Sequence, residues 1–446
     1  RSQCSGETAS TLDANMNSML ITGARIIDPS QAIDRVGHLL VRDGRVAGLV
    51  DEAATADEVI DAAGCIVCPG FVDLHVAFRE PGHEDDEDTA TGSAAALAGG
   101  FTTVACTPDT EPVVDNRGGA EFIIRQAERA RHCRVLPLGA VTRNLDGKEL
   151  AEIGQLVEGG AVGFTDAKRP LDNAEVMRRA LEYTRMFGRP ILSFPQVPEL
   201  AERGVMHEGR YSMLLGLRGI PAAAETIAVG RDIALCDLTG GRLHLMCLST
   251  RGGVEQVRQA KREGVAVTAD VTPHHLALTD ETLRSFDSNY KVEPPLRSRE
   301  HVDALIAGLK DGTIDAISSD HQPYAEEKKD GEIDLVPAGT IGLETLLPIC
   351  IATLIEPGHI DWPRLIELLS TGPARILSLE AGTLRPGAAA DVTIIDPTVE
   401  WTIDPADFRS KSRNTPFAGR TVRGRARTVF VGGQARFQRE QLIRAL

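Results

Sequence analysis

The 446-residue chain lacks any long uninterrupted apolar run, and it is short of positive charge. Its apolar segments are broken by Gly, Pro or Asp well before the roughly 20 residues that a membrane-spanning helix requires. Lys and Arg together number 48, against 64 Asp and Glu, which gives a formal charge of −16. Nucleic-acid-binding proteins present a basic surface. We therefore expect neither a membrane span nor a nucleic-acid partner, and an anionic membrane surface is disfavoured for the same reason.

Cysteine is also scarce, with eight residues in the chain, too few for a disulfide-stapled scaffold. Cys65 and Cys68 form a CxxC pair, but no second pair completes a zinc site and the pair lies in an apolar run. We interpret both as buried core thiols. Residues 1–18 are polar and lack the apolar segment of a signal peptide. We expect them to form a disordered extension, with a natural start at Met16 or Met19, and we expect a cytoplasmic protein.

Two kinds of pattern divide the rest of the chain. Residues 19–68 contain short apolar segments joined by Gly or Asp-Gly turns, which is typical of antiparallel strands. Residues 376–446 have the same texture, so we predict that the two flanks form the two halves of one β-sandwich. Between them, residues 69–375 alternate short β-branched segments with helix-patterned stretches, which predicts an α/β fold, a (β/α)8 TIM barrel.

The predicted barrel strands end at the positions where TIM barrels carry their chemistry, the C-terminal ends of the strands. We place these strands at 71–76, 101–106, 134–140, 161–165, 190–194, 242–248, 265–272 and 314–320. The helices that we predict between them include 120–132, 173–188, 252–264 and 298–312.

The first barrel strand ends with the sequence His75-Val76-Ala77. Alternate residues of a strand share a face, so positions 75 and 77 both face the barrel mouth. A His-x-His there would offer two imidazoles to a metal, but the second position is Ala77. The residues that close the later strands are Asp166, Phe194, Cys247 and Asp320, and the seventh strand runs into His274 and His275.

These motifs resemble the dihydroorotases of the amidohydrolase superfamily. The stretch PGFVDLHVAFREPG (69–82) is similar to the start of a dihydroorotase barrel, and the likeness continues in order through VTADVTPHHLALTDE, KVEPPLR, DGTIDAISSDHQPY and KSRNTPF. It spans nearly everything from Met19 to the end. The resemblance implies the longer, bacterial type with a β-sandwich beside the barrel. It also implies a zinc pair whose bound hydroxide attacks a cyclic amide while an Asp of strand eight moves the proton.

The six metal-ligand positions implied by the resemblance are only partly kept. Those that match are His75, Asp166 and Asp320. Cys247 stands where the family has a His, and a thiolate is an acceptable zinc ligand. Ala77 and Phe194 cannot coordinate a metal. We therefore expect no cofactor, with Asp320 left as a vestigial general base, and zinc only if a mononuclear site survives.

The residues that resemble a substrate-carboxylate site are altered as well. Arg79 is retained, but the resemblance places Asp109 and Glu293 where the family has Asn, and Tyr324 where it has His. Two carboxylates in a site for a carboxylate would each cost about 1 kcal/mol or more, which is roughly tenfold in binding. Loss of the metal ligands together with loss of the anion site indicates release from catalytic constraint.

Three hypotheses remain open. The first is a non-catalytic dihydroorotase homologue in pyrimidine biosynthesis that serves as a structural partner of aspartate transcarbamoylase. The second is a repurposed amidohydrolase with one metal, acting on a different cyclic amide, and the third is a working dihydroorotase with unusual ligands. We expect a homo-oligomer in each case. Simpler interpretations accompany the motifs: structural carboxylates at Asp166 and Asp320, a small core residue at Cys247, a loop-ordering His274–His275 pair, and a solvated loop over Glu326–Asp330.

Overall fold

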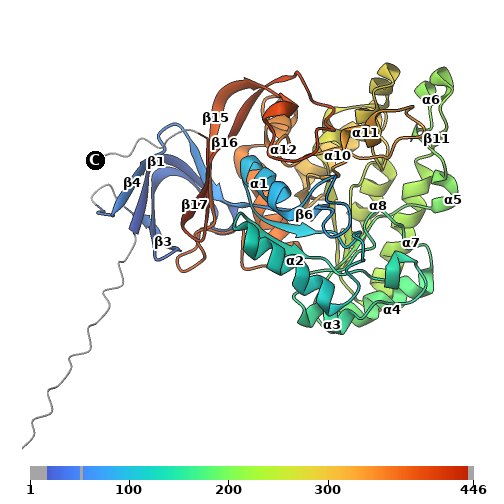
Figure 1. The fold of residues 1–446 in the computed structure, drawn as a ribbon, viewed down its shortest axis with the longest axis horizontal. Helices are drawn as coiled ribbons and strands as arrows, with labels where there is room; N and C mark the ends of the chain where they lie inside the picture. Colours follow the sequence, from blue (N-terminus) through green and yellow to red (C-terminus); the bar gives the residue numbers. More distant parts are fainter. Residues whose placement is uncertain (1–17, 51–53, 440–446) are drawn as a thin grey trace, which may run out of the picture.

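The computed structural model describes residues 18–50 and 54–439, and it divides into a β-sheet part and a barrel (Figure 1). The extension expected over residues 1–18 lies outside the described residues, except that Ser18 begins the first strand. No helix among the described residues is long and apolar enough to cross a membrane.

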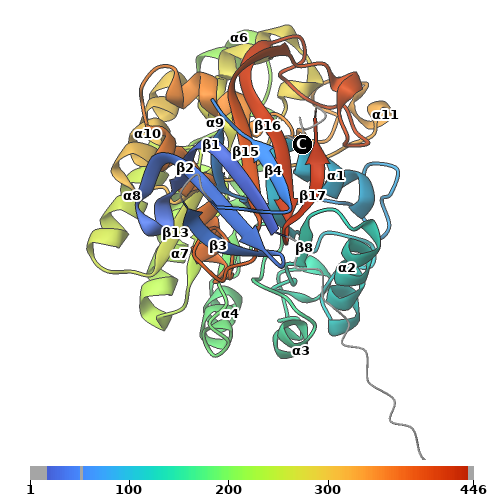
Figure 2. The same cartoon turned by 90° about the vertical axis from the view of Figure 1, so that its left-hand side faces the viewer.

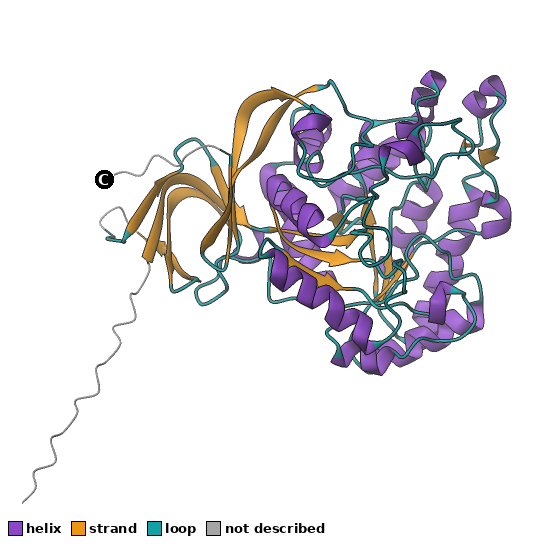
Figure 3. Ribbon diagram, in the orientation of Figure 1, coloured by secondary structure: helices purple, strands orange, loops and turns teal. Residues whose placement is uncertain are grey.

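An eight-stranded sheet joins the two ends of the chain. Its strands follow the order β17-β16-β15-β5-β1-β2-β3, and β4 also pairs with β1. Their bounds are β1 (Ser18–Asp28), β2 (Ile33–Arg42), β3 (Arg45–Val50), β4 (Glu58–Asp61), β5 (Ile66–Pro69), β15 (Val392–Thr402), β16 (Thr421–Val431) and β17 (Gln434–Gln438). The antiparallel pairing of β5 with β15 sets Val67 opposite Ile394. This contact joins the N-terminal and C-terminal segments, and the strands curve over their own apolar core (Figures 2 and 3).

Cys65 and Cys68 are buried free thiols beside and within β5. Cys65 belongs to the core of this sheet, and Cys68 packs on the barrel side. Burial raises the pKa of both thiols. They are core residues, as the apolar context predicted.

Eight parallel segments form the barrel. Their named strands are β6 (Phe71–Val76), β7 (Phe101–Cys106), β8 (Arg134–Pro137), β9 (Ile191–Ser193), β12 (Leu243–Leu245), β13 (Val267–Val271) and β14 (Ala316–Ile317). Of the fourth predicted strand, 161–165, only Phe164 makes ladder bridges, one to Gly139 and one to Ile191. A further bridge between Val76 and His321 closes the ring. The (β/α)8 barrel with a flanking β-domain that the sequence predicted is confirmed.

Helices cover the outside of the barrel (Figure 3). Their bounds are α1 (Thr89–Gly99), α2 (Arg117–Ala130), α3 (Ile153–Glu158), α4 (Ala174–Arg185), α5 (Pro198–Ala201), α6 (Arg210–Leu215), α7 (Ala223–Thr239), α8 (Arg251–Arg262), α9 (Pro273–Ala277), α10 (Arg299–Asp311), α11 (Glu326–Lys329), α12 (Leu346–Cys350), α13 (Trp362–Ile366) and α14 (Gly372–Ile376). Outside the barrel, β10 (Met206–His207) and β11 (Gly219–Ile220) form a short parallel pair. The start of α8 is fixed by Thr250, whose side chain accepts a hydrogen bond from the Gly253 N–H.

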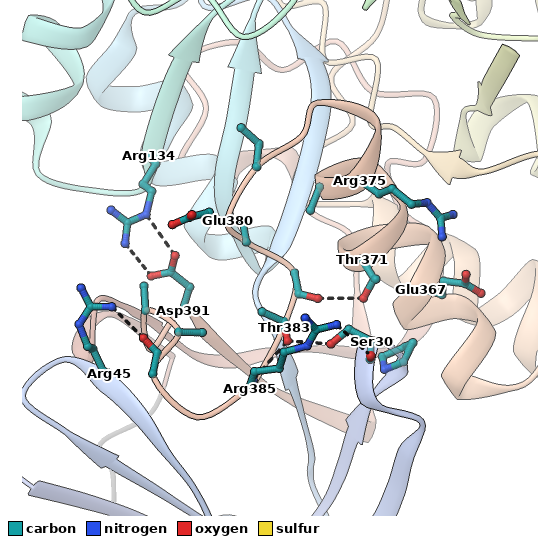
Figure 4. Close-up of a pocket in the computed structure, with 18 residues that line it drawn as sticks. Ser30, Arg45, Arg134, Glu367, Thr371, Arg375, Glu380, Thr383, Arg385 and Asp391 are labelled. Atoms are coloured by element: carbon teal, nitrogen blue, oxygen red, sulfur yellow. Dashed lines mark hydrogen bonds and ion pairs between the residues drawn. The ribbon is translucent and has the colours of Figure 1, made fainter. Parts of the chain in front are cut away.

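A cavity of about 1060 Å³ lies between the sheet domain and the barrel, lined by residues of both. Figure 4 shows Arg134, at the start of β8, clasping Asp391. Because Arg134 opens its strand, this cavity lies at the N-terminal face of the barrel, where TIM barrels gain stability rather than catalysis. The Arg134–Asp391 contact joins the barrel to the sheet domain. Catalytic or metal-binding residues are therefore expected at the C-terminal face of the barrel.

Candidate functional site

Three predicted metal-site residues converge at the C-terminal end of the barrel. His75 lies on β6, Cys247 follows β12 and Asp320 follows β14, and one ligand atom from each lies within 4.8 Å of the others. All three are buried. Cys247 and Asp320 have left-handed backbone angles, with φ of 54° and 49°. This conformation is costly for residues other than glycine and concentrates at functional sites.

A fourth buried group, Asp270 on β13, holds this cluster together. Its carboxylate pairs with His75 Nε2 at 2.8 Å and with His244 Nε2 at 3.0 Å. It also accepts the backbone N–H of Cys247 at 2.8 Å. Burial alone would lower the pKa of His75, but the Asp270 carboxylate raises it well above the usual value. Conversely, burial would raise the pKa of Asp270, and His75 holds it well below its usual range. The two form a buried ion pair.

The side chain of Lys168 enters the same cluster. Its ammonium lies 2.8 Å from Asp320 Oδ1 and 3.3 Å from Cys247 Sγ, and it donates to the Glu293 carbonyl at 2.9 Å. It also lies 4.8 Å from the centre of the Phe194 ring, a cation–π contact. Burial would lower the pKa of Lys168, but Asp320 and Cys247 raise it above the usual value. The lysine is a fixed cation between two of the three candidate metal ligands.

The charged groups of the cluster are paired. Lys168 lies against Asp320, and His75, whose pKa Asp270 raises against the effect of burial, lies against Asp270. His274, whose Nε2 lies 3.9 Å from Asp320 Oδ2, contributes no charge, because burial lowers its pKa to about 3. A buried group of charges is tolerated when it is paired and hydrogen-bonded in this way.

The predicted match at Asp166 serves a different purpose. Its carboxylate accepts the backbone N–H groups of Val141 at 2.8 Å and Thr142 at 3.0 Å, and it is not part of the three-residue group. The next residue, Ala167, has a φ of 54°, which turns the chain away from the strand direction. Asp166 is therefore a structural carboxylate, as the simpler interpretation held, and it is not placed as a metal ligand.

We expect the replacement Asp166→Ala to lower the free energy of unfolding by about 2–3 kcal/mol, because the buried Val141 and Thr142 amides lose their acceptor. Thermal unfolding of the variant measures this. The exposed Glu182→Gln variant is the control, with a change within about 0.5 kcal/mol. A stable Asp166→Ala protein that has lost a bound metal would contradict the structural role.

Ala77 and Phe194 occupy their positions as the sequence indicated. The Ala77 N–H donates to the His321 carbonyl at 3.0 Å, and its methyl group is buried. Phe194 and Cys247 both belong to the apolar cluster that fills the barrel. Apolar side chains, Ala77 and Phe194, therefore occupy the two positions where the resemblance implies imidazole ligands.

The guanidinium of Arg79 is already engaged. It pairs with Asp109 at 3.0 Å, donates to Gln322 Oε1 at 2.9 Å and lies 4.9 Å from the centre of the Tyr324 ring. Burial would lower its pKa, and the Asp109 carboxylate raises it above the usual value. Arg79 is 7% exposed. A substrate carboxylate would have to displace Asp109 to reach it.

The other altered positions also have partners within the chain. Glu293 accepts a hydrogen bond from the Gln196 amide at 2.8 Å, and the Tyr324 N–H donates to Asn414 Oδ1 at 3.2 Å. Cavities of about 420 and 620 Å³ open beside Glu293 and Asp109 respectively. Neither has a residue of the three-residue group in its lining.

The sequence predicted a loop-ordering His274–His275 pair and a solvated loop over Glu326–Asp330. His275 accepts from or donates to Thr272 Oγ1 at 2.7 Å and contacts the Pro294 carbonyl at 2.9 Å, which ties α9 to the segment after it. The prediction of a solvated loop over Glu326–Asp330 is wrong for Lys329. That residue is buried in α11 and donates to the carbonyls of Pro337 and Gly339.

Lys168 and Asp270 were missed by the sequence reasoning. Asp270 carried a usable signal, since a carboxylate inside an otherwise apolar barrel strand is costly unless it is paired. Lys168 carried none, because the left-handed Ala167 breaks the alternation that would place it.

The residues present do not fit the zinc pair that the resemblance implies. Three of the six expected positions, Ala77, Asp166 and Phe194, offer no ligand atom to the cluster. The remaining ligands could hold one ion by their chemistry. However, the Lys168 ammonium contacts Asp320 and Cys247, and Asp270 binds the Nε2 atom of His75. A metal would have to displace a cation that these groups already hold.

A family model and the curated relatives point to one family, and the solved structures share its fold. Residues 64–253 match the family model described as "Dihydro-orotase-like". The dihydroorotase of Anaeromyxobacter sp. (strain K) is 47% identical over 420 residues, covering 93% of this chain and 97% of its own. That of Syntrophotalea carbinolica is 45% identical over 421 residues, with 94% and 99% covered. Among solved structures, the L-hydantoinase (dihydropyrimidinase) of Arthrobacter aurescens superposes with a TM-score of 0.86 at 26% identity, covering 96% of this chain and 97% of that one.

Proposed function

The chain belongs to the dihydroorotase family of amidohydrolases in pyrimidine metabolism, and we propose that it is a member that does not hydrolyse dihydroorotate. The observation that carries the proposal is the Lys168 ammonium, which lies 2.8 Å from Asp320 and 3.3 Å from the Cys247 sulfur. A metal ion would need Asp320 and Cys247 as ligands, and both already contact the Lys168 ammonium.

The proposed loss of hydrolysis follows from two residues, Asp320 and Arg79, that already form ion pairs within the chain. Asp320 is the position that would move the proton, and its Oδ1 atom is bound by Lys168. The lysine ammonium therefore occupies the oxygen atom that would have to accept the proton. Arg79, the position that would bind the substrate carboxylate, is neutralised by Asp109 at 3.0 Å. Both catalysis and substrate binding are therefore opposed by contacts within the chain.

A non-catalytic member acts by binding, and the partner that we propose to test is aspartate transcarbamoylase. This partner is suggested by the family resemblance alone, since no contact within the chain selects it. Size-exclusion chromatography of the two purified proteins tests it directly. Co-elution supports the partnership, and separate elution at micromolar concentrations removes it while leaving the proposal about the site intact.

A second candidate is a metal-dependent cyclic amidohydrolase with a mononuclear site. It is favoured by the relatives, which are named dihydroorotase at about 45% identity, and dihydroorotases are usually metal-dependent. It is also favoured by the His75, Cys247 and Asp320 atoms that lie within 4.8 Å of one another. In this candidate Cys247 and Asp320 would hold one zinc with His75, after Lys168 has moved away.

Metal content separates the two candidates. We expect the protein, expressed with added zinc and purified without chelator, to hold well under one zinc per chain, because Lys168 supplies the positive charge that Asp320 requires. Elemental mass spectrometry measures the zinc, and a dihydroorotate hydrolysis assay accompanies it. The Anaeromyxobacter dihydroorotase prepared in parallel is the positive control for both measurements.

The outcome that overturns the proposal is one tight equivalent of zinc together with turnover of dihydroorotate or another cyclic amide. A Cys247→Ala variant would then show whether the thiol holds the ion. Zinc without turnover of dihydroorotate would favour a repurposed hydrolase, and screening would move to cyclic amides that lack a carboxylate.

A further inference from the structure

The cavity between the sheet domain and the barrel, of about 1060 Å³, has no role in the site described above. None of its lining residues belongs to the cluster of His75, Cys247 and Asp320. Arg45 lines it from β3 of the sheet domain, and Arg375 lines it from α14 of the barrel (Figure 4). Small-molecule sites occur preferentially where two domains meet, with volumes of about 300–1,000 Å³. The cavity therefore has the place and the size of a ligand site, and it is independent of the proposed function.

The lining of this cavity carries unbalanced positive charge. Its charged residues are the arginines Arg45, Arg134, Arg375 and Arg385 and the carboxylates Glu367, Glu380 and Asp391. Asp391 is held by Arg134 at 3.0 Å. Glu367 pairs at 2.7 Å with Arg364, which lies outside the lining. In the part of the chain that the structure describes, the other three arginines form no ion pair, and Glu380 alone is left to face them. This local excess of cations, in a chain with a formal charge of −16, attracts an anion.

Hydrogen-bond donors that lack a full set of acceptors lie around Arg385. Its guanidinium makes a single long hydrogen bond, at 3.4 Å, to the Ser30 carbonyl. The Ser30 and Thr383 hydroxyl oxygens are 2.7 Å apart, and Thr383 Oγ1 also accepts the Arg385 N–H at 3.2 Å. This pair has two hydroxyl protons and its mutual bond uses one, so the other is free for a ligand. Figure 4 shows Arg385 beside both hydroxyl groups.

The backbone that leads to Thr383 adds further donors. The N–H groups of residues 380–383 donate to no acceptor among the described residues, and all four residues line the cavity. The chain turns here through Gly382, which has a φ of 69°. Successive backbone N–H groups in a turn are a recurring means of binding anions. A phosphate dianion offers only acceptor oxygens, so it matches this surplus of donors.

The rest of the lining contains no aromatic side chain. Its apolar members are small or aliphatic, such as Pro29, Ala374 and Leu379. Proteins commonly hold nucleic-acid bases by stacking them on aromatic rings. A ligand of this cavity is therefore recognised by its charge rather than by a stacked base.

We propose that this cavity binds a phosphorylated small molecule, whose phosphate lies against the Arg385 guanidinium and the Ser30–Thr383 hydroxyl pair. A guanidinium presents a planar fork of N–H donors that matches the geometry of phosphate oxygens. Arg45 and Arg375 add positive charge along the same lining. The cavity is large enough for a whole small molecule, so the phosphate is one end of the ligand and the remainder extends along the junction of the two domains.

Isothermal titration calorimetry of the full chain tests the site with three probes: inorganic phosphate, glucose 6-phosphate and AMP. We expect all three to bind in about 0.15 M salt, with the dissociation constants of the two esters within about tenfold of each other. Arg385→Gln should weaken the binding of each probe by at least about tenfold, because it removes charge-assisted hydrogen bonds. Its melting temperature without a probe should stay unchanged, since Arg385 is exposed.

The matched control is Arg262→Gln. Arg262 is also exposed and forms no ion pair with the described residues, but it lies in the last turn of α8, outside the lining. Its variant should bind the probes like the unaltered chain. Binding of inorganic phosphate alone would mean an adventitious ion only and would overturn the proposal. Binding of AMP alone would mean recognition of the base and would overturn it too. Failure of all three probes to bind, unchanged binding by Arg385→Gln, or equal weakening by Arg262→Gln also contradicts it.

Discussion

Replacing Lys168 with Met is expected to lower the free energy of unfolding by about 3–5 kcal/mol, the cost of breaking a buried ion pair by removing one partner. The lysine side chain is 20% exposed, but the carboxylate that would be left behind is buried: the Asp320 side chain is 3% exposed, and its Oδ1 atom lies 2.8 Å from the lysine nitrogen. Methionine keeps the length and the apolar stem of the side chain but leaves this carboxylate without a cation. Urea or thermal unfolding of the purified chain measures the loss.

Two matched variants decide whether the ion pair is the cause. Lys148→Met removes a lysine whose side chain is 79% exposed, and its effect should stay within about 0.5 kcal/mol. Asp320→Asn in the Lys168→Met background should recover much of the loss, because the unpaired charge is gone. Equal losses from the two lysine variants, or no recovery with Asn, would contradict the ion-pair account.

Zinc gives the Lys168→Met variant a second readout. If the ammonium excludes the metal, zinc should raise the melting temperature of the variant and leave that of the unaltered chain unchanged. Stabilisation of the unaltered chain by zinc would instead favour the metal-dependent candidate.

The barrel could be predicted because parallel strands are buried on both faces and therefore appear as short apolar runs. Strand β6 coincides with the predicted 71–76, and β7 with 101–106. The fourth strand was overestimated, since only Phe164 bridges its neighbours. Helix α7 was not singled out because its outer face is apolar, so the polar side of the usual helical period is missing.

The site could be predicted only in part. Strand ends meet at one face of a barrel, and of the four residues that the sequence grouped there, His75, Cys247 and Asp320 lie within 4.8 Å of one another, whereas Asp166 does not join them. Asp166 was assigned by its place in the motif, but its side chain turns to the amides of Val141 and Thr142. The direction of the Asp166 side chain depends on which backbone amides lie beside it in the folded barrel, and no sequence pattern reports that.

The effect of Asp109 also differs from the expectation. The sequence predicted that its charge would repel a bound anion. In the structure Asp109 neutralises Arg79 at 3.0 Å, so the anion site is closed by an internal ion pair as well as by repulsion. The physical conclusion is the same, but the contact that produces it could be found only in three dimensions.

Replacing Asp270 with Asn should be as damaging as the loss of Lys168, at about 3–5 kcal/mol of unfolding free energy. Asp270 is fully buried and binds His75, His244 and the Cys247 amide. Asparagine has the same shape but only one acceptor oxygen, so the protonated His75 loses its counter-charge and at least one donor loses its acceptor.

The control for Asp270→Asn is Asp315→Asn. Asp315 pairs with Lys261 at 2.7 Å, but its side chain is 12% exposed and that of Lys261 is 24% exposed. Asparagine keeps an oxygen atom for the buried Ala269 N–H, which Asp315 accepts at 2.9 Å. Water can replace the lost contact with Lys261, so we expect a loss of about 1 kcal/mol. Thermal unfolding of both variants at one pH makes the comparison. A mild Asp270→Asn variant, no worse than the control, would mean that His75 is not held as a cation. A neutral His75 would be able to act as a zinc ligand, so one of the two obstacles to a metal ion would be removed, while the contacts of Lys168 with Asp320 and Cys247 would remain.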